Sequence, residues 1–340
     1  MVELPRLALV LLVDAPAGYA ARTFSDEVVT DLATAASRLE RGEGCAAALG
    51  DDRRAWLELA RAHHVPVRVL RFGDSIPAGR LARDGFRHVH DLTRATSIVR
   101  TAMPSDRRED HGPFDVIGDV HGCLAELRGL LRRLGYTGAG HPEGRKAVFL
   151  GDLVDRGPDV HGVVTLVMAM VRDGHALCVP GNHESKLARK LRRPPRAMDA
   201  LADFIERLPS HYVLDRGQLV VAHAGLPLCM HGRDSGAVRA FALYGDTRGE
   251  TDADGLPVRH DWAASYDGAA TVVYGHTPVR EAVWVNRTIC IDTGCVYGGA
   301  LTALRWPERE LVSVGAERVW MEPVRPLHAG VRSGFTPPKK

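Results

Sequence analysis

The chain has 340 residues, of which 45% are apolar and 6% aromatic, so it can bury two hydrophobic cores. Its formal net charge of +2 excludes binding to nucleic acid through overall charge, and any such attraction must be local. The apolar run at residues 7–13 is too short to span a bilayer, and we interpret it as a buried strand rather than a signal peptide.

The first hundred residues alternate between strand and helix patterns, which predicts a small α/β unit. The expected strands lie at 7–13 and 65–72, and the expected helices at 26–39 and 53–63. Charged residues and two prolines make the stretch around residues 104–112 the best candidate for a linker.

The rest of the chain again alternates between short apolar runs and helical patterns. The predicted strands are 114–117, 147–150, 176–179, 219–222, 271–274 and 288–291. The predicted helices are 124–134, 160–172 and an interrupted region at 184–208. Six cysteines occur without a CxxC pair, which makes a zinc ribbon unlikely and favours reduced, buried thiols in a cytoplasmic protein.

Five polar motifs follow the apolar runs, where α/β sheets place their sites. They occupy residues 118–122, 151–157, 181–184, 222–225 and 275–278. Together they contain six residues of the types that bind hard divalent ions: Asp119, His121, Asp152, Asn182, His223 and His276. Two such ions roughly 3.5–4 Å apart can activate water and clamp phosphoryl oxygens. The alternative, that these residues merely cap loops, would usually hold for one Asp or His, but six in one context favour a site.

Five further residues in or near these motifs have expected roles. Arg156 offers a planar fork for phosphate oxygens, with a structural ion pair as the alternative. His183 is a candidate proton donor oriented by Asp155, with metal ligation as the alternative. Asp292 is interpreted as a carboxylate that orients a ligand histidine, with direct ligation as the alternative. Glu184 is expected to be a helix N-terminal carboxylate.

The five motifs resemble the phosphoprotein-phosphatase branch of the calcineurin-like metallophosphoesterases. The resemblance implies a mixed α/β (α+β) fold, a β-sandwich flanked by helices. It also implies two divalent metal ions, with Mn²⁺ expected and Ni²⁺, Fe²⁺ or Mg²⁺ as alternatives. By resemblance, one ion is held by Asp119, His121 and Asp152, and the other by Asp152, Asn182, His223 and His276. Arg156 and Asn182 would bind the substrate phosphate, while His183 and Asp155 would form the acid pair.

Segments outside the motifs are most similar to the central phosphatase domain of bacterial polynucleotide kinase-phosphatase. They are residues 111–115, 141–146, 210–214, 241–245, 255–259, 285–290 and 301–304. This resemblance implies hydrolysis of phosphomonoesters and 2′,3′-cyclic phosphates at nucleotide or RNA 3′ ends, in RNA repair. The alternatives are a dinucleoside tetraphosphatase, a serine/threonine protein phosphatase, or a scaffold that docks a separate repair ligase or methyltransferase subunit.

In that repair enzyme a P-loop kinase precedes the phosphatase, and residues 14–24 resemble a decayed P-loop. Its required glycines, lysine and hydroxyl are replaced by Ala15, Ala20, Ala21 and Arg22. The implied organisation is a degenerate kinase-like domain at 1–103, a linker at 104–112, the metallophosphoesterase at 113–327 and a flexible tail at 328–340. The alternative for the first part is an unrelated small α/β domain.

A basic run follows the Asn-His motif and consists of Lys186, Arg189, Lys190, Arg192, Arg193 and Arg196. It could steer a polyanionic substrate, and a solvated helix surface explains it equally well. Without interleaved aromatic residues it does not indicate sequence-specific reading of RNA.

Overall fold

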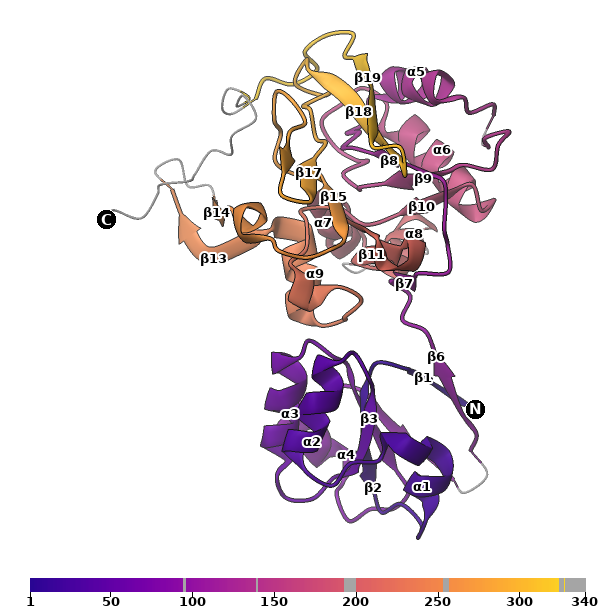
Figure 1. The fold of residues 1–340 in the computed structure, drawn as a ribbon, viewed down its shortest axis with the longest axis vertical. Coiled ribbons are helices and arrows are strands. Elements are labelled where there is room, and N and C mark those ends of the chain that lie inside the picture. Colours follow the sequence, from indigo (N-terminus) through magenta and orange to yellow (C-terminus); the bar gives the residue numbers. More distant parts are fainter. Residues whose placement is uncertain (94–95, 139, 193–199, 253–256, 324–326, 328–340) are drawn as a thin grey trace. The chain divides into compact units, whose positions relative to one another are not determined.

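A computed structural model of the chain describes all residues except 94–95, 139, 193–199, 253–256, 324–326 and 328–340 (Figure 1). The chain forms two compact units. The first comprises Met1–Pro104 with Gly232–Val238, and the second comprises Ser105–His231 with Arg239–Lys340. The tail predicted at 328–340 lies outside the described residues.

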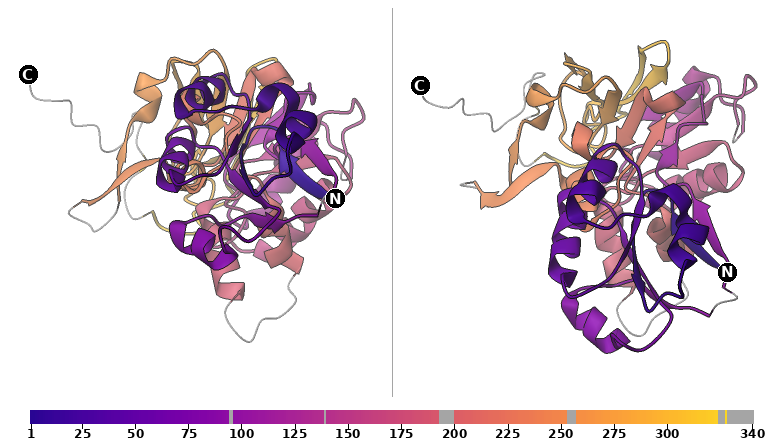
Figure 2. Two further views of the ribbon diagram at one scale, coloured as in Figure 1. Left: turned by 90° about the horizontal axis from the view of Figure 1, so that it is seen from below. Right: turned by 60° about the horizontal axis from the view of Figure 1, so that its bottom comes forward.

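The N-terminal unit is built on a four-stranded parallel sheet in the order β3-β2-β4-β5. Its strands are β2 (Leu9–Val13), β3 (Cys45–Ala48), β4 (Val67–Arg71) and β5 (Val89–Asp91). Its helices are α1 (Tyr19–Phe24), α2 (Leu32–Glu40), α3 (Arg53–Ala62) and α4 (Ala78–Asp84). Helices α2 and α3 cover one face of this sheet and α1 lies on the other (Figure 2). Alternate residues of β2 pack against these two layers, as period-two alternation requires. A separate parallel pair joins β1 (Val2–Pro5) to β6 (Ile98–Thr101).

The turn between β2 and α1 and the helix that follows it contain Ala15, Ala20, Ala21 and Arg22. Arg22 folds back over this turn and donates from Nη2 to the carbonyl oxygen of Ala17 at 3.2 Å. A side chain at Gly18 would meet this guanidinium at 2.6 Å. The Arg22 guanidinium therefore lies over this turn, and Ala15, Ala20 and Ala21 are its neighbours in sequence.

The C-terminal unit contains two large sheets. One has five strands in the order β10-β9-β8-β18-β19: β8 (Phe114–Ile117), β9 (Lys146–Phe149), β10 (Ala176–Cys178), β18 (Ala300–Trp306) and β19 (Glu310–Gly315). The other has six strands in the order β16-β17-β15-β12-β11-β7: β7 (Asp106–Arg107), β11 (His211–Leu214), β12 (Leu219–Ala222), β15 (Thr271–Tyr274), β16 (Trp284–Val285) and β17 (Thr288–Cys290). A two-stranded hairpin, β13 (Asp246–Thr251) and β14 (Pro257–His260), stands apart from both sheets.

The inner faces of the two sheets share one hydrophobic core, which contains Phe114 and Val148 of one sheet and Leu219 and Ile289 of the other. A second core packs α5 (Leu124–Leu134) and α6 (Val160–Arg172) against the five-stranded sheet (Figure 1). The remaining helices of this unit are α7 (Asn182–Leu191), α8 (Ala200–Arg207) and α9 (Gly236–Tyr244). The predicted mixed α/β fold, a β-sandwich flanked by helices, is confirmed.

Local sequence explains where the flanking helices begin and end. Helix α5 buries leucines at 124, 127, 130, 131 and 134, the spacing of one helical face. It ends at Gly135, whose φ of 102° favours glycine. Helix α6 begins after Asp159, whose side chain accepts the N–H of Gly162 at 2.7 Å.

Some predicted boundaries differ from the structure. The helix expected at 26–39 begins at Leu32, because Asp31 caps it by accepting the N–H of Thr34. The proposed linker at 104–112 contains β7, which pairs with β11. Within the described residues, no helix is long and apolar enough to cross a membrane. All six cysteines are free, and Cys229 alone among them is exposed.

Parallel pairing brings the polar motifs together. Strands β8, β9 and β10 run parallel, and so do β12, β15 and β17. The carboxyl ends of each set therefore meet at one edge, and these ends carry the motifs.

A buried ion-pair network holds the opposite end of β8. The fully buried Asp115 carboxylate accepts from Arg145 and, at 3.2 Å, from Arg305. Arg145 also donates to the carbonyl oxygens of Phe114 and Trp306 and to Glu308. This network ties β8 and β18 to the start of β9.

We expect Arg145→Met to lower the free energy of unfolding by about 3–5 kcal/mol, because it leaves most of the Asp115 charge buried and unpaired. Urea denaturation followed by tryptophan fluorescence measures this loss. The matched control is Arg305→Met, which removes the more exposed partner and should cost clearly less. Equal losses in the two variants would contradict the central place of Arg145.

Candidate metal centre

The six predicted ligands lie on loops at the strand ends of the two sheets. Asp119 and His121 follow β8, and Asp152 follows β9. Asn182 begins α7 after β10. In the second sheet, His223 directly follows β12, and His276 comes two residues after β15. Except for the half-buried Asn182 and His276, these residues are buried.

Asp152 stands between two groups of ligand atoms. Its Oδ2 lies 3.4 Å from Nε2 of His121, and its Oδ1 lies 3.6 Å from Nε2 of His223. Asp152 groups with His121 and His183 on one side, and with His223 and His276 on the other. This placement fits a carboxylate that bridges two cations.

The second group is close enough to share one cation. Nε2 of His223 lies 3.0 Å from Oδ1 of Asn182 and 3.0 Å from Nδ1 of His276. Asp119 adds a carboxylate that accepts the backbone N–H of His276 at 3.1 Å on Oδ2. Its Oδ1 is buried and has no hydrogen-bond partner among the described residues.

Backbone carbonyls fix the ring nitrogens of two histidines. Nδ1 of His121 donates to the carbonyl of Val154, and Nδ1 of His223 donates to that of Leu150, each at 2.9 Å. In the neutral ring the other nitrogen, Nε2, then carries a lone pair. Both Nε2 atoms face the carboxylate of Asp152, as metal-binding imidazoles require.

Burial disfavours the charged forms of the carboxyl and imidazole groups in this site. It raises the pKa of Asp152 to about 6 and that of Asp292 to about 7. The pKa of Asp119 rises well above its usual value through burial and the nearby charges of Asp292 and Asp152. Burial also lowers the pKa of His223 to about 4, which keeps its ring neutral.

The donor set therefore fits a pair of hard divalent ions. It offers oxygens and neutral imidazole nitrogens, an unpartnered carboxylate oxygen on Asp119, and buried carboxylates that repel one another. Cations bound among these groups would offset that repulsion. His121, Asp152, Asn182, His223, His276 and Asp119 would hold them.

Several site residues have strained backbone. His121, Asp152 and His276 have φ values of 44°, 47° and 73°, in the left-handed region that non-glycine residues seldom adopt. Asp155 and Arg156 share this conformation. Such strain persists only where surrounding contacts determine it, and it is common at functional sites.

Glu184 supplies several of these contacts. Its buried carboxylate accepts the backbone N–H groups of Asp152, Leu153 and Val154 at 2.7–3.1 Å. It also accepts the N–H of Gly181 at 2.8 Å, at the start of α7. As expected, Glu184 lies at a helix N-terminus, and it additionally holds the Asp152 loop in place.

Arg156, His183 and Asp155 form a chain of contacts beside the ligands. Nδ1 of His183 lies 2.6 Å from Oδ2 of Asp155, and Nε2 of His183 lies 3.0 Å from Nη2 of Arg156. The other guanidinium nitrogen, Nη1, reaches Nε2 of His121 at 2.5 Å. The Arg156 guanidinium also stacks 5.4 Å from the ring of Tyr297. Asp155 thus orients the ring of His183, whose Nε2 accepts from Arg156 because a guanidinium can only donate. The acid role of His183 and the phosphate-binding role of Arg156 stay predictions.

Asp292 has a different surrounding from the one expected. Its Oδ1 accepts the N–H of Gly294 at 3.1 Å, and its Cβ lies close to Gly275. Its negative charge helps to raise the pKa of Asp119. Among the described residues its hydrogen bond goes to the backbone and not to a ligand histidine, so its orienting role stays a prediction.

Arg259 was given no role from sequence, yet its charge reaches the site. It is near enough to lower the pKa of both His223 and His276. Its side chain is half-buried, and its Nε is buried without a hydrogen-bond partner among the described residues. A guanidinium near metal ligands suits an anionic substrate. The signal in sequence was weak, because a charged residue in a hairpin has no motif.

The basic run after the Asn-His motif is only partly described. Arg189 bonds to Ser185 and Tyr244, and Arg192 forms an ion pair with Glu206. Lys186 and Lys190 are both exposed on α7. Arg193 and Arg196 lie outside the described residues. Two of these cations are thus engaged within the protein.

We expect Glu184→Gln to weaken Mn²⁺ binding about 10- to 100-fold, because an amide accepts fewer of the four N–H groups and the Asp152 loop loses its fixed shape. Calorimetric titration of the purified protein with Mn²⁺ measures this change. As a control, Asp31→Asn alters another helix-capping carboxylate in the N-terminal unit and should leave the affinity unchanged. Wild-type affinity in Glu184→Gln would show that the carboxylate does not organise the site.

Comparisons with known proteins agree with this geometry. The family model for calcineurin-like phosphoesterases matches residues 112–280. Relatives from Anoxybacillus flavithermus and Bacillus subtilis are both named bis(5'-nucleosyl)-tetraphosphatase PrpE (asymmetrical). They are 43% and 45% identical over 228 residues, which make up 59% of this chain and 93% of each relative. A Geobacillus relative with the same name is 45% identical with the same coverage.

These matches correct the expected similarity to polynucleotide kinase-phosphatase. The named relatives are tetraphosphatases and not kinase-phosphatases, and the family match begins at residue 112. It therefore gives no support to a kinase-like origin of the preceding residues. The expectation of a metal-dependent phosphoesterase is confirmed. The chain belongs to the calcineurin-like phosphoesterase family, and it is a phosphoester hydrolase.

Proposed function

We propose that this protein hydrolyses dinucleoside tetraphosphates asymmetrically, into a nucleoside monophosphate and a nucleoside triphosphate. The observation that supports this most is the identity of 43–45% to proteins of that name, over 93% of their length. Water adds to one phosphorus of the chain while the bond from that phosphorus to a bridging oxygen breaks. Phosphoanhydride oxygens carry high negative charge, which the cationic residues of the site complement.

Divalent ions, when bound at the six ligands, supply Lewis acidity that polarises phosphoryl oxygens and activates water. We propose Mn²⁺ as the ion, since the carboxylate and amide oxygens of the site suit it. Arg156 holds the phosphoryl oxygens from one side, and the half-buried Arg259 adds positive charge from the other group of ligands. Asn182 contributes its amide to the same phosphate. His183, oriented by Asp155, donates a proton to the departing oxygen.

The expected role in RNA repair has less support than the hydrolysis of dinucleoside tetraphosphates. A site of this kind can hydrolyse 2′,3′-cyclic phosphates or phosphoproteins, because its residues recognise the phosphate rather than its substituents. The named relatives, however, favour the dinucleotide. No relative named here points to a repair partner or a scaffold.

We expect the purified, Mn²⁺-loaded protein to show at least a tenfold higher kcat/KM for diadenosine tetraphosphate than for 2′,3′-cyclic AMP or a phosphoserine peptide. Ion-exchange chromatography should show AMP and ATP in equal amounts. Asp152→Ala, which removes the shared ligand, is the control that excludes a contaminating phosphatase and should lose activity on all three substrates. A preference for the cyclic nucleotide, or ADP as the product, would contradict the proposal.

We expect His183→Ala to spare p-nitrophenyl phosphate, whose leaving group needs no proton, and to slow an alkyl phosphomonoester by about 10²–10⁴-fold. Steady-state kcat values on p-nitrophenyl phosphate and glycerol 2-phosphate make the comparison. His161→Ala, on the exposed face of α6, is the matched control and should change neither rate. An equal loss on both substrates would remove the acid role from His183.

A further inference from the structure

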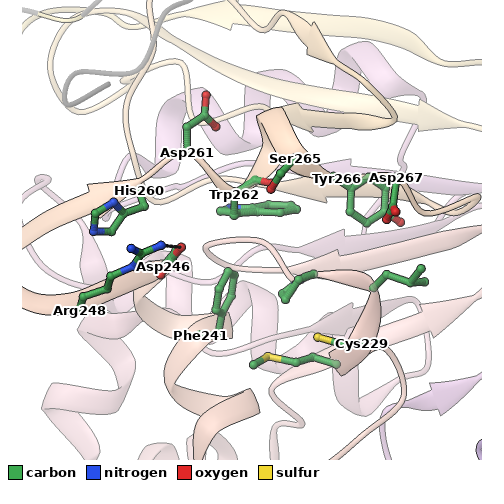
Figure 3. Close-up of a pocket in the computed structure, with 13 residues that line it drawn as sticks. Cys229, Phe241, Asp246, Arg248, His260, Asp261, Trp262, Ser265, Tyr266 and Asp267 are labelled. Carbon is green, nitrogen blue, oxygen red and sulfur yellow. Dashed lines mark hydrogen bonds and ion pairs between the residues drawn. The ribbon is translucent and has the colours of Figure 1, made fainter. Parts of the chain in front are cut away.

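The C-terminal unit has a pocket of about 900 Å³, a size typical of small-molecule sites. Three segments line it: the loop that follows His223, helix α9, and the chain from β13 to the residues just after β14. Its apolar side includes Leu228, Phe241 and Trp262. Figure 3 shows Asp246, Arg248 and His260 gathered to one side of these rings. None of these residues belongs to the six ligands or the acid pair.

We infer that this pocket holds one nucleoside of the substrate, an inference that rests on the proposed hydrolysis of dinucleoside tetraphosphates. The aromatic part consists of Phe241, Trp262 and Tyr266, with ring centroids 6.0 Å apart in each contact with Trp262. The two contacts are edge-to-face, which fixes the rings in position. A half-buried ring such as Phe241 offers an apolar face to a planar base.

The polar part suits the uncharged groups of a nucleoside. Asp246 and Asp261 line the pocket and can accept from ribose hydroxyls or an exocyclic amine. Their charges disfavour a phosphate at the same place. Arg248 lies 3.7 Å from Asp246 and partly balances its charge. The pocket therefore fits the nucleoside end of a nucleotide, and the phosphates belong elsewhere.

Both strands of the hairpin contribute to the polar side of the pocket. Consecutive strand residues point to opposite faces and lie about 3.3 Å apart along the strand. His260 of β14 lines the pocket, so the preceding residue, Arg259, belongs to the opposite face. Asp246 pairs with His260 across the hairpin, so both share the pocket face.

Two more contacts hold the pocket against the metal loops. The Trp262 ring lies against Gly225, where a side chain would come within 1.9 Å of Cζ2, so this close approach requires glycine. Gly225 is two residues from the ligand His223. On its other side, Trp262 packs 5.2 Å from the ring of Tyr274, two residues before His276. The segments that contain Gly225 and Tyr274 therefore position both the Trp262 ring of the pocket and the ligands His223 and His276.

The test uses Phe241→Ala, which removes the half-buried ring, and Ser265→Trp, which fills the pocket from an exposed position. In each full-length, Mn²⁺-loaded variant we expect kcat/KM for diadenosine tetraphosphate to fall about tenfold more than that for p-nitrophenyl phosphate. The control Trp284→Ala removes a partly exposed ring outside the pocket and should not change this ratio.

The possible outcomes separate this inference from the proposed function. If wild type hydrolyses diadenosine tetraphosphate and neither variant changes the ratio, the pocket assignment is wrong and the function stands. An equal fall on a phosphoserine peptide would also overturn it, since the pocket would then accept a polypeptide. If wild type leaves every dinucleoside polyphosphate intact, the function and the nucleoside site both fall.

Discussion

The metal centre depends on the buried carboxylate of Glu184, which is not one of the predicted metal ligands. Glu184 accepts four backbone N–H groups and thereby joins the loop after β9 to the start of α7. Asp152 and Asn182 lie on these two segments. A side chain at Gly181 would come within 2.0 Å of Asp152, so the segments are in direct contact. Burial raises the pKa of Glu184, yet these donors favour its charged form.

The contacts made by Glu184 explain how the strained backbone of these loops can persist. Left-handed backbone at His121, Asp152 and His276 costs free energy that the two sheets and the Glu184 contacts must offset. In return, the loops turn sharply enough for their side chains to converge at the sandwich edge. The converging carboxylates then repel one another, which bound cations would relieve. Loop strain and charge repulsion are both consequences of gathering these ligands.

Much of this arrangement could be predicted because its signals are local. Asp119, Asp152 and His223 each follow a short apolar run, and parallel strands bring such positions to one edge. Other features depend on contacts distant in sequence. The role of Glu184 requires the β9 loop, and that of Arg259 requires a hairpin whose strand β13, Asp246–Thr251, has no apolar alternation. The segment 232–238 joins the first unit through tertiary contacts alone.

Substrate choice in this family must come from outside the metal residues, because those residues recognise only the phosphate. In this chain the loops that carry His223 and His276 also support Trp262, through Gly225 and Tyr274. A change in that aromatic packing would therefore disturb the ligands as well as the pocket. Arg248 lines the pocket from β13 and forms an ion pair with Asp246, outside that aromatic packing. Specificity can accordingly change at such a position on β13, while the constrained packing around Trp262 keeps the metal centre intact.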